Sequence, residues 1–279
     1  MSVKRLWLKN LLTVLLAAAG VTFLLVGTLM LLNDARTAES YIELAQSLGP
    51  TVTDTASVSP EQTIDAGDNS SYEELVTESD TIAGSSVVDP SWEALIAINE
   101  DTIGWLTVDG TSINLPVTQS SVDDPDFYLT HDFWNTLSTT GTPYLAAQTD
   151  PEGLVIMIFG HHTTITGFMF YDLAGCFEQK SFEDVGTAIW ITPEAGSTNF
   201  EPLCSLRVAS TDTTLMNFDA STEEEMRTWL TQSCTDATAV SDNYDELLAT
   251  ATRALILVTC TGSLYGSSSR TITIFVCTY

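Results

Sequence analysis

Three residues in the second half of the chain have side chains suited to covalent catalysis, and each lies at the end of an apolar run of strand length. Cys260 ends the run 254–260, His161 follows the run 154–159 and its Gly160, and Arg270 opens the run 271–276. A thiolate is a nucleophile, an imidazole can protonate a leaving amine, and a nearby guanidinium favours the thiolate. This set of residue types is suited to nucleophilic catalysis on an acyl group.

Each of these residues also has a less specific interpretation. A cysteine at the end of an apolar strand is more often a small buried hydrophobe, but Cys260 stands where Thr261 and Gly262 break the pattern, so it can be partly exposed. Neighbouring residues of an extended chain point to opposite faces, which disfavours a zinc site built from His161, His162 and Cys260. We therefore expect no metal and no cofactor, and we give His131 a structural role.

The chain contains five cysteines, the others being Cys176, Cys204, Cys234 and Cys277. Outside the membrane disulfides can persist, and an odd number leaves at least one thiol without a partner within the chain. If Cys260 is kept as a free nucleophile, the other four are available to pair. The sequence leaves their pairing open.

The N-terminus predicts an uncleaved membrane anchor. Residues 11–32 carry no charge and are about as long as the ~20 residues that span a bilayer, while Lys4, Arg5 and Lys9 precede them. This arrangement places residues 1–10 in the cytoplasm and exports the rest. A cleaved signal peptide is disfavoured because the small residues 17–20 lie inside the apolar run rather than after it.

The exported part is strongly acidic, with all 37 Asp and Glu but only six of the nine Lys and Arg of the chain. Such a charge disfavours binding to nucleic acid or to an anionic membrane surface. Residues 33–89 are rich in Ser, Thr, Ala, Asp and Glu and predict a mostly disordered stalk, with short helices possible over 38–48 and 72–78.

Residues 90–279 predict a mainly β catalytic domain. A short helix over 91–98 is followed by eight short apolar runs, which are 105–108, 113–117, 143–147, 154–159, 188–192, 203–209, 255–260 and 271–277. Helical segments over 221–230 and 242–252 lie between the sixth and seventh of these runs. Eight closely spaced strands indicate a closed barrel or a sandwich, with a helical insertion before the strand of Cys260.

These motifs, in this order, resemble the sortases, the membrane-anchored cysteine transpeptidases of mainly Gram-positive bacteria. The matching residues are Leu257-Val-Thr-Cys260, Phe159-Gly-His161 and Arg270. The segments 99–105, 115–119 and 128–133, together with the helical insertion, are similar to class B in particular, across 91–279. Class B members commonly have serine two residues before the cysteine, where this chain has Val258.

The resemblance implies an eight-stranded sortase-type β-barrel and a role for each site residue. Cys260 would attack the threonine carbonyl of a C-terminal sorting motif similar to Leu-Pro-x-Thr-Gly or Asn-Pro-x-Thr-Asn. His161 would act as general acid and base, and Arg270 would bind the motif and stabilise the oxyanion. Thr259 and Thr261 are assigned to substrate binding.

The implied partners are exported proteins with a sorting motif and an amine acceptor, either a cell-wall precursor or a pilin lysine. The implied location is the cell membrane, with a single span and an extracellular catalytic domain. A pilin-polymerising enzyme and a secreted cysteine protease that uses water as the acceptor are the alternatives.

Overall fold

The computed structural model describes residues 3–53, 86–147, 149–164, 166–214, 218, 220–262 and 268–278. Most of the expected stalk, residues 54–85, lies outside the described residues, as does the possible helix over 72–78.

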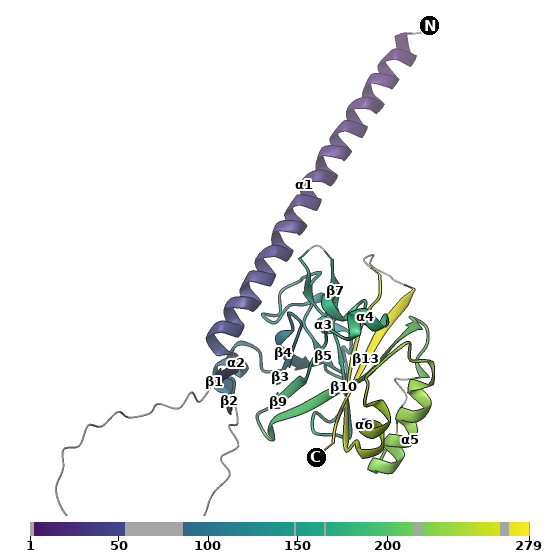
Figure 1. Ribbon diagram of the computed structural model, residues 1–279. Helices are drawn as coiled ribbons and strands as arrows, with labels where there is room; N and C mark the ends of the chain where they lie inside the picture. Colours follow the sequence, from purple (N-terminus) through teal and green to yellow (C-terminus); the bar gives the residue numbers. More distant parts are fainter. Residues whose placement is uncertain are drawn as a thin grey trace, which may run out of the picture.

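Eight strands close into a mixed β-barrel, as the sequence predicts (Figure 1). They are β3 (Thr102–Val108), β4 (Asn114–Gln119), β5 (Tyr144–Leu145), β6 (Val155–Phe159), β9 (Ala188–Thr192), β10 (Gly196–Ala209), β12 (Arg253–Cys260) and β13 (Ser269–Cys277). The order is β10-β13-β12-β6-β5-β4-β3-β9, and β9 pairs again with the first half of β10 to close the ring. The β6–β12 and β4–β5 pairs are parallel, and the other pairs are antiparallel.

Shorter elements connect or cover the barrel. They are the strand pairs β1 (Thr51–Thr53) with β2 (Ser86–Val88) and β7 (His162–Thr163) with β8 (Phe168–Met169), the added strand β11 (Ala239–Val240), and the helices α2 (Trp92–Ile98), α3 (Phe127–Thr130), η1 (Tyr171–Leu173), α4 (Gln179–Phe182), α5 (Glu223–Ser233), η3 (Cys234–Asp236) and α6 (Tyr244–Thr250). The expected helices 91–98, 221–230 and 242–252 correspond to α2, α5 and α6.

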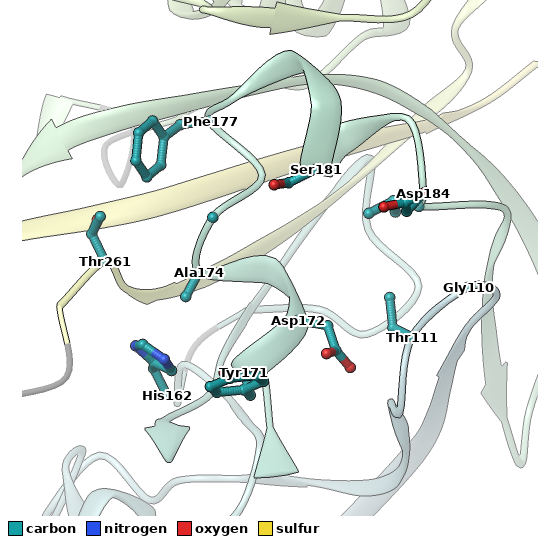
Figure 2. A pocket seen from close by; sticks show the side chains of 12 residues that line it. Gly110, Thr111, His162, Tyr171, Asp172, Ala174, Phe177, Ser181, Asp184 and Thr261 are labelled. Carbon is teal, nitrogen blue, oxygen red and sulfur yellow. The ribbon is translucent and has the colours of Figure 1, made fainter. Parts of the chain in front are cut away.

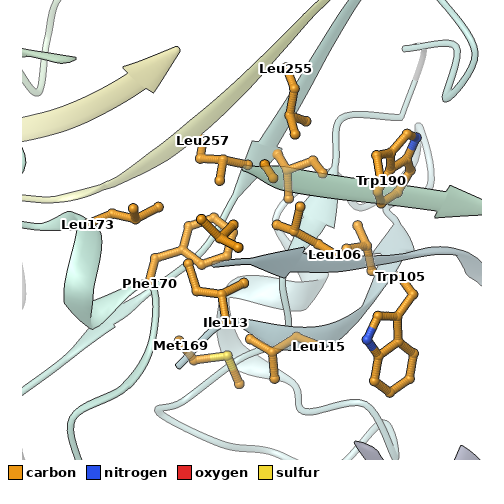
Figure 3. Packing of buried hydrophobic residues seen from close by; sticks show 14 of the residues in the cluster. Trp105, Leu106, Ile113, Leu115, Met169, Phe170, Leu173, Trp190, Leu255 and Leu257 are labelled. Carbon is orange, nitrogen blue, oxygen red and sulfur yellow. The ribbon is translucent and has the colours of Figure 1, made fainter. Parts of the chain in front are cut away.

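The period-two pattern of β6, β12 and β13 builds two cores, one on each face of these strands. Leu255 and Leu257 point into the barrel (Figure 3), where they join Trp105, Leu106 and Phe170. Their neighbours Ala254, Ile256 and Val258 point outward and pack under the helical insertion. The outer core is completed by residues of α5, η3 and α6, which are Met226, Leu230, Cys234 and Leu247.

The insertion begins with a capping box, which fixes where α5 starts. The Thr222 side chain accepts a hydrogen bond from the Glu225 backbone N–H, and the Glu225 carboxylate accepts one from the N–H of Ser221. Glu223, Glu224 and Glu225 also place negative charge at the positive end of the helix dipole. Met226 and Leu230, one turn apart, then form the face that packs on β12.

The N-terminal helix is α1 (Val3–Leu48). By length and composition, the first part of its described residues could cross a membrane. It extends away from the barrel (Figure 1), and its apolar side chains, such as Phe23 and Leu24, are exposed. Exposed apolar side chains of this kind suit a lipid environment.

The same helix continues through residues 33–48, the segment expected to begin the disordered stalk, and its end packs on the barrel. Ala38, Tyr41 and Leu44 are buried in the main core, and their spacing gives one apolar stripe along α1. The Tyr41 ring contacts Trp134 and Phe168. This first part of the segment is therefore ordered, because its helical apolar stripe buries surface that a tether would leave in water.

Replacement of Tyr41 by phenylalanine is expected to destabilise the protein by about 1–3 kcal/mol, because a buried donor loses its partner. The Tyr41 hydroxyl accepts from the Phe133 N–H at 2.9 Å and contacts the Gly141 carbonyl and the Thr142 hydroxyl, each at 3.0 Å. Urea unfolding of the full chain in detergent measures the change. The matched control is Tyr171→Phe, at a ring that is 41% exposed, and it should shift stability by less than about 0.5 kcal/mol. Equal effects of the two variants would contradict the docking role of Tyr41.

Candidate active site

The strand register places Cys260, Arg270 and His161 in a row across three neighbouring strands. Cys260 of β12 lies opposite Arg270 of β13 in the antiparallel register. On the other side of β12, Val258 lies beside Phe159 of the parallel strand β6, and the Gly160 N–H donates to the Val258 carbonyl at 3.0 Å. Continuing this register by two residues brings His161 beside Cys260. Neighbouring strands are about 4.8 Å apart, so the three residues stand side by side.

Side-chain alternation puts this row on the outer face of the sheet. Cys260 continues the outward series of Ile256 and Val258 along β12, and Arg270 continues that of Ile272 on β13. His161 likewise follows Phe159, which packs against the outer core. Cys260 and Arg270 are neither fully buried nor fully exposed. A thiol in this position is held by a rigid strand and can still be reached from solvent.

The His161 ring is oriented by the loops beside it. Its Nε2 atom lies 2.7 Å from the Leu129 carbonyl oxygen, at the end of α3. A carbonyl only accepts hydrogen bonds, so Nε2 carries the hydrogen, and in the neutral ring Nδ1 is the free nitrogen. The backbone of Gly141 lies so close that an added Cβ would stand 2.8 Å from His161 Cδ2, and Gly141 has a positive φ of 65°. Glycine is required there, because any side chain would displace the ring.

His162 points to the other side of the strand end, as the alternation predicts. It lines a cavity of about 480 Å³ together with Tyr171, Asp172 and Thr261 (Figure 2). Burial lowers the pKa of His162, while the backbone oxygens of Gly262 and Cys260 act in the opposite direction. The His162 Nδ1 atom is buried and makes no hydrogen bond. His162 is therefore placed on the opposite face from the Cys260 side chain.

The two threonines assigned to substrate binding also lie on the side away from Cys260. Thr259 is 3% exposed, and its hydroxyl is buried without a hydrogen-bond partner. The Thr261 hydroxyl lies 3.2 Å from that of Thr271, and Thr271 donates in turn to the Ala174 carbonyl. The structure thus groups Cys260, His161 and Arg270 and does not bring the side chains of Thr259 and Thr261 onto their face.

An aromatic pair that the sequence does not predict lies beside this row. Tyr144 of β5 lies opposite Phe159 in the antiparallel register, and their rings stack with centroids 5.5 Å apart. Burial raises the pKa of Tyr144 to about 12, and the Arg270 charge acts against this shift, so the guanidinium is within electrostatic range of the ring. The two rings extend the row toward β5. A two-residue strand led by Pro143 gives too short a pattern to predict this contact.

Among the residues that the structure describes, no group of three or more His, Cys, Asp or Glu side chains is placed to hold a metal ion. His131, for which a structural role is expected, stacks on Phe127 with centroids 3.9 Å apart, and its Nδ1 lies 2.9 Å from the Phe127 carbonyl oxygen.

Comparison with known proteins relates this fold to the sortases. The chain is 32% identical to Sortase B of Listeria monocytogenes over 106 residues, which are 37% of this chain and 41% of that protein. It is also 32% identical to Sortase B of Staphylococcus aureus over 77 residues, which are 27% of this chain and 31% of the relative. The chain thus spans less than half the length of the curated relatives that it matches. No family model matches the sequence.

Solved structures of class B sortases share the fold. The structure of Clostridium perfringens sortase B superposes with a TM-score of 0.57 at 23% identity, over 67% of this chain and 98% of the other. The Staphylococcus aureus sortase B–substrate complex gives 0.55 at 20% identity, over 67% and 83% of the two chains. Sortase B complexed with triglycine gives 0.55 at 21% identity, over 67% and 84%. The chain has the class B sortase fold, and the resemblance seen in the sequence is confirmed.

Proposed function

We propose that the chain is a class B sortase-type cysteine transpeptidase with Cys260 as nucleophile, His161 as general acid and base, and Arg270 as the oxyanion-stabilising cation. The observation that carries the proposal is the row of these three residues on one face of β6, β12 and β13. The similarity to sortase B proteins in sequence and fold supports it.

In the proposed reaction the Cys260 thiolate attacks the threonine carbonyl of a sorting motif similar to Leu-Pro-x-Thr-Gly or Asn-Pro-x-Thr-Asn. The carbonyl oxygen becomes an oxyanion beside Arg270, whose fixed planar cation stabilises the developing charge. The proton that Cys260 gives up is held at Nδ1 of His161, which passes it to the departing amine, so the peptide bond breaks and a thioester remains. The hydrogen bond from Nε2 to the Leu129 carbonyl keeps the ring in place during this transfer.

The second half of the proposed reaction reverses these roles. The neutral Nδ1 of His161 removes a proton from an incoming amine, which then attacks the thioester and releases the Cys260 thiolate. The acceptor in this proposal is an amine of a cell-wall precursor. The solved complexes of related proteins with a substrate and with triglycine are consistent with a peptide donor and an amine acceptor.

The proposed location follows from the apolar part of α1. Residues 11–32 would span the cell membrane with residues 1–10 in the cytoplasm, residues 33–89 would link the anchor to the domain, and the catalytic domain of residues 90–279 would lie outside. Exposure of the apolar side chains of α1 supports this arrangement. An enzyme that joins exported proteins to the cell surface has to work on that side of the membrane.

Mass spectrometry of the purified protein with sorting peptides and amines tests this function. Peptides with Leu-Pro-x-Thr-Gly and Asn-Pro-x-Thr-Asn motifs are incubated with triglycine, with a peptide bearing a free lysine side chain, or with no added amine. We expect an acyl adduct on Cys260 and a new amide product with one of the amines. Capture only by the lysine peptide would indicate pilin polymerisation. Hydrolysis with no capture by any amine would indicate a cysteine protease and would contradict the proposed transpeptidation.

A further inference from the structure

Two cysteines outside the proposed active site lie close enough to form a covalent bond. Cys204 is in β10 and Cys234 opens η3, directly after α5. Their sulfur atoms are 3.0 Å apart, although the residues are 30 positions apart in the chain. Non-bonded heavy atoms usually pack about 3.5–4.0 Å apart, and a disulfide bond measures about 2.05 Å. A further movement of about 1 Å therefore brings the two sulfurs to bonding distance.

The position of this pair suits a structural cross-link. Cys204 is 0% exposed and is held between two strands, opposite Val240 of β11 and Ile274 of β13. Cys234 is 5% exposed and belongs to the outer core that the insertion forms over β12. A bond between them would fix the end of α5 to the barrel wall. The insertion covers Val258, two residues before Cys260, so the cross-link would also stabilise the packing under the proposed active site.

The pKa shifts of the two thiols have opposite directions. The Cys204 thiol donates to the Cys234 sulfur, and this hydrogen bond together with burial raises the pKa of Cys204. The same hydrogen bond lowers the pKa of Cys234, with a further contribution from the Tyr244 hydroxyl. Cys234 is thus the residue that more readily forms the thiolate, which is the attacking species in thiol–disulfide exchange. It is also the more exposed of the two.

We propose that Cys204 and Cys234 form a disulfide bond in the exported protein. The Cys234 thiolate attacks a sulfur of an external disulfide, carried by a small thiol compound or by a protein oxidant, and one external thiol leaves. The Cys204 thiol then loses its proton and attacks the Cys234 sulfur of the mixed disulfide, which releases the second external thiol. The two cysteines lose two electrons and two protons in total, and the external disulfide is reduced to two thiols.

The remaining cysteines occupy separate places. The Cys176 thiol donates to the Asp172 carbonyl at 3.3 Å, and Cys277 lies opposite Arg253 at the far end of the β12–β13 pair from Cys260. The proposed bond therefore leaves the Cys260 thiol free. The inference depends on the proposed location outside the cell, where disulfides persist, and it does not depend on transpeptidation.

Thiol counting on the exported protein tests the bond directly. The full chain is produced in a Gram-positive host, alkylated on intact cells and again after denaturation without reductant, and digested for peptide mapping. We expect three alkylated cysteines of the five and one cross-linked peptide pair containing Cys204 and Cys234. Five alkylated cysteines, or Cys204 linked to any other cysteine, would overturn the proposal.

A stability comparison separates this cross-link from a loss of packing. Closing a loop of about 30 residues is expected to raise the unfolding midpoint by about 10 °C for a domain of this size. Protein that is reduced in urea and refolded with reductant should lose this increment, and a Cys204→Ala/Cys234→Ala variant should show no dependence on reductant. The matched Cys176→Ala/Cys277→Ala variant also lacks two thiols and should keep the full dependence. Equal reductant dependence of the two double variants would overturn the inference.

The two proposals fail separately. Incubation of the reduced purified protein with oxidised glutathione reports whether the pair closes by itself, while the peptide and amine assay reports transpeptidation. Closure with glutathione, combined with five free thiols on the cell surface, would overturn the disulfide and leave the transpeptidase proposal untouched. A protein with the cross-link but no amine transfer would overturn the transpeptidase proposal and leave the disulfide untouched.

Discussion

Replacement of Cys260 by alanine is expected to abolish both the acyl adduct and the amide product, with a loss of at least about 10⁴-fold in rate. The proposed mechanism forms its one covalent bond to the Cys260 sulfur, and neither His161 nor Arg270 can replace it. Intact-mass measurement after incubation with peptide reports the adduct, and liquid chromatography with added triglycine reports the product.

The matched control for this variant is Cys277→Ala. Cys277 is on the neighbouring strand at the other end of the β12–β13 pair, so this variant removes a thiol without reaching the proposed site. Its acyl adduct and product should form at rates within a few fold of the unchanged protein. An adduct that persists in Cys260→Ala would show that another residue is the nucleophile, and the proposed site would then be wrong.

Replacement of His161 by alanine is expected to lower the transfer rate by about 10²–10⁴-fold, the usual contribution of a positioned general acid. His162→Ala, at the adjacent histidine, should cost less than about tenfold, because alternation directs that ring to the cavity on the opposite face. The ratio of kcat/KM values for the two variants is the measurement. Circular dichroism of both variants checks that each retains the fold.

Added imidazole distinguishes a lost proton donor from a displaced backbone. It should restore part of the transfer rate of His161→Ala and leave that of His162→Ala unchanged. A larger loss in His162→Ala than in His161→Ala would reverse the assignment. The proton transfer would then take place on the opposite face, which is the side of the cavity lined by Thr261, Tyr171 and Asp172.

The barrel could be predicted from the sequence because its strands carry strong local patterns. The apolar runs ending at Phe159 and Cys260 are bounded by glycine, and the capping box at Thr222 marks the start of the insertion. The sequence could predict which residues form the row, namely Cys260, His161 and Arg270, because each of them stands at the end of such a run. Their adjacency depends on the parallel β6–β12 pairing, which is a long-range contact.

The features that the sequence did not reveal depend on tertiary contacts without a local pattern. Tyr144 reaches the site from a two-residue strand, and the Leu129 carbonyl that orients His161 is a backbone atom. The proximity of Cys204 and Cys234 depends on the docking of α5. Residues 33–48 have an acidic, alanine-rich composition that suits a tether as well as a helix, and only the burial of Tyr41 in the main core distinguishes the helix from a tether.

In the proposed membrane arrangement, the docked end of α1 would make the link between membrane and barrel a rigid spacer. With residues 11–32 in the membrane as proposed, the buried Tyr41 is only nine positions after Leu32, a helical rise of about 14 Å. Tyr41 contacts Gly141, whose backbone lies against the His161 ring. The proposed active site would then stand at a fixed height and angle above the lipid surface. Acceptors attached to lipid would be selected by the distance between their amine and the bilayer as well as by their chemistry.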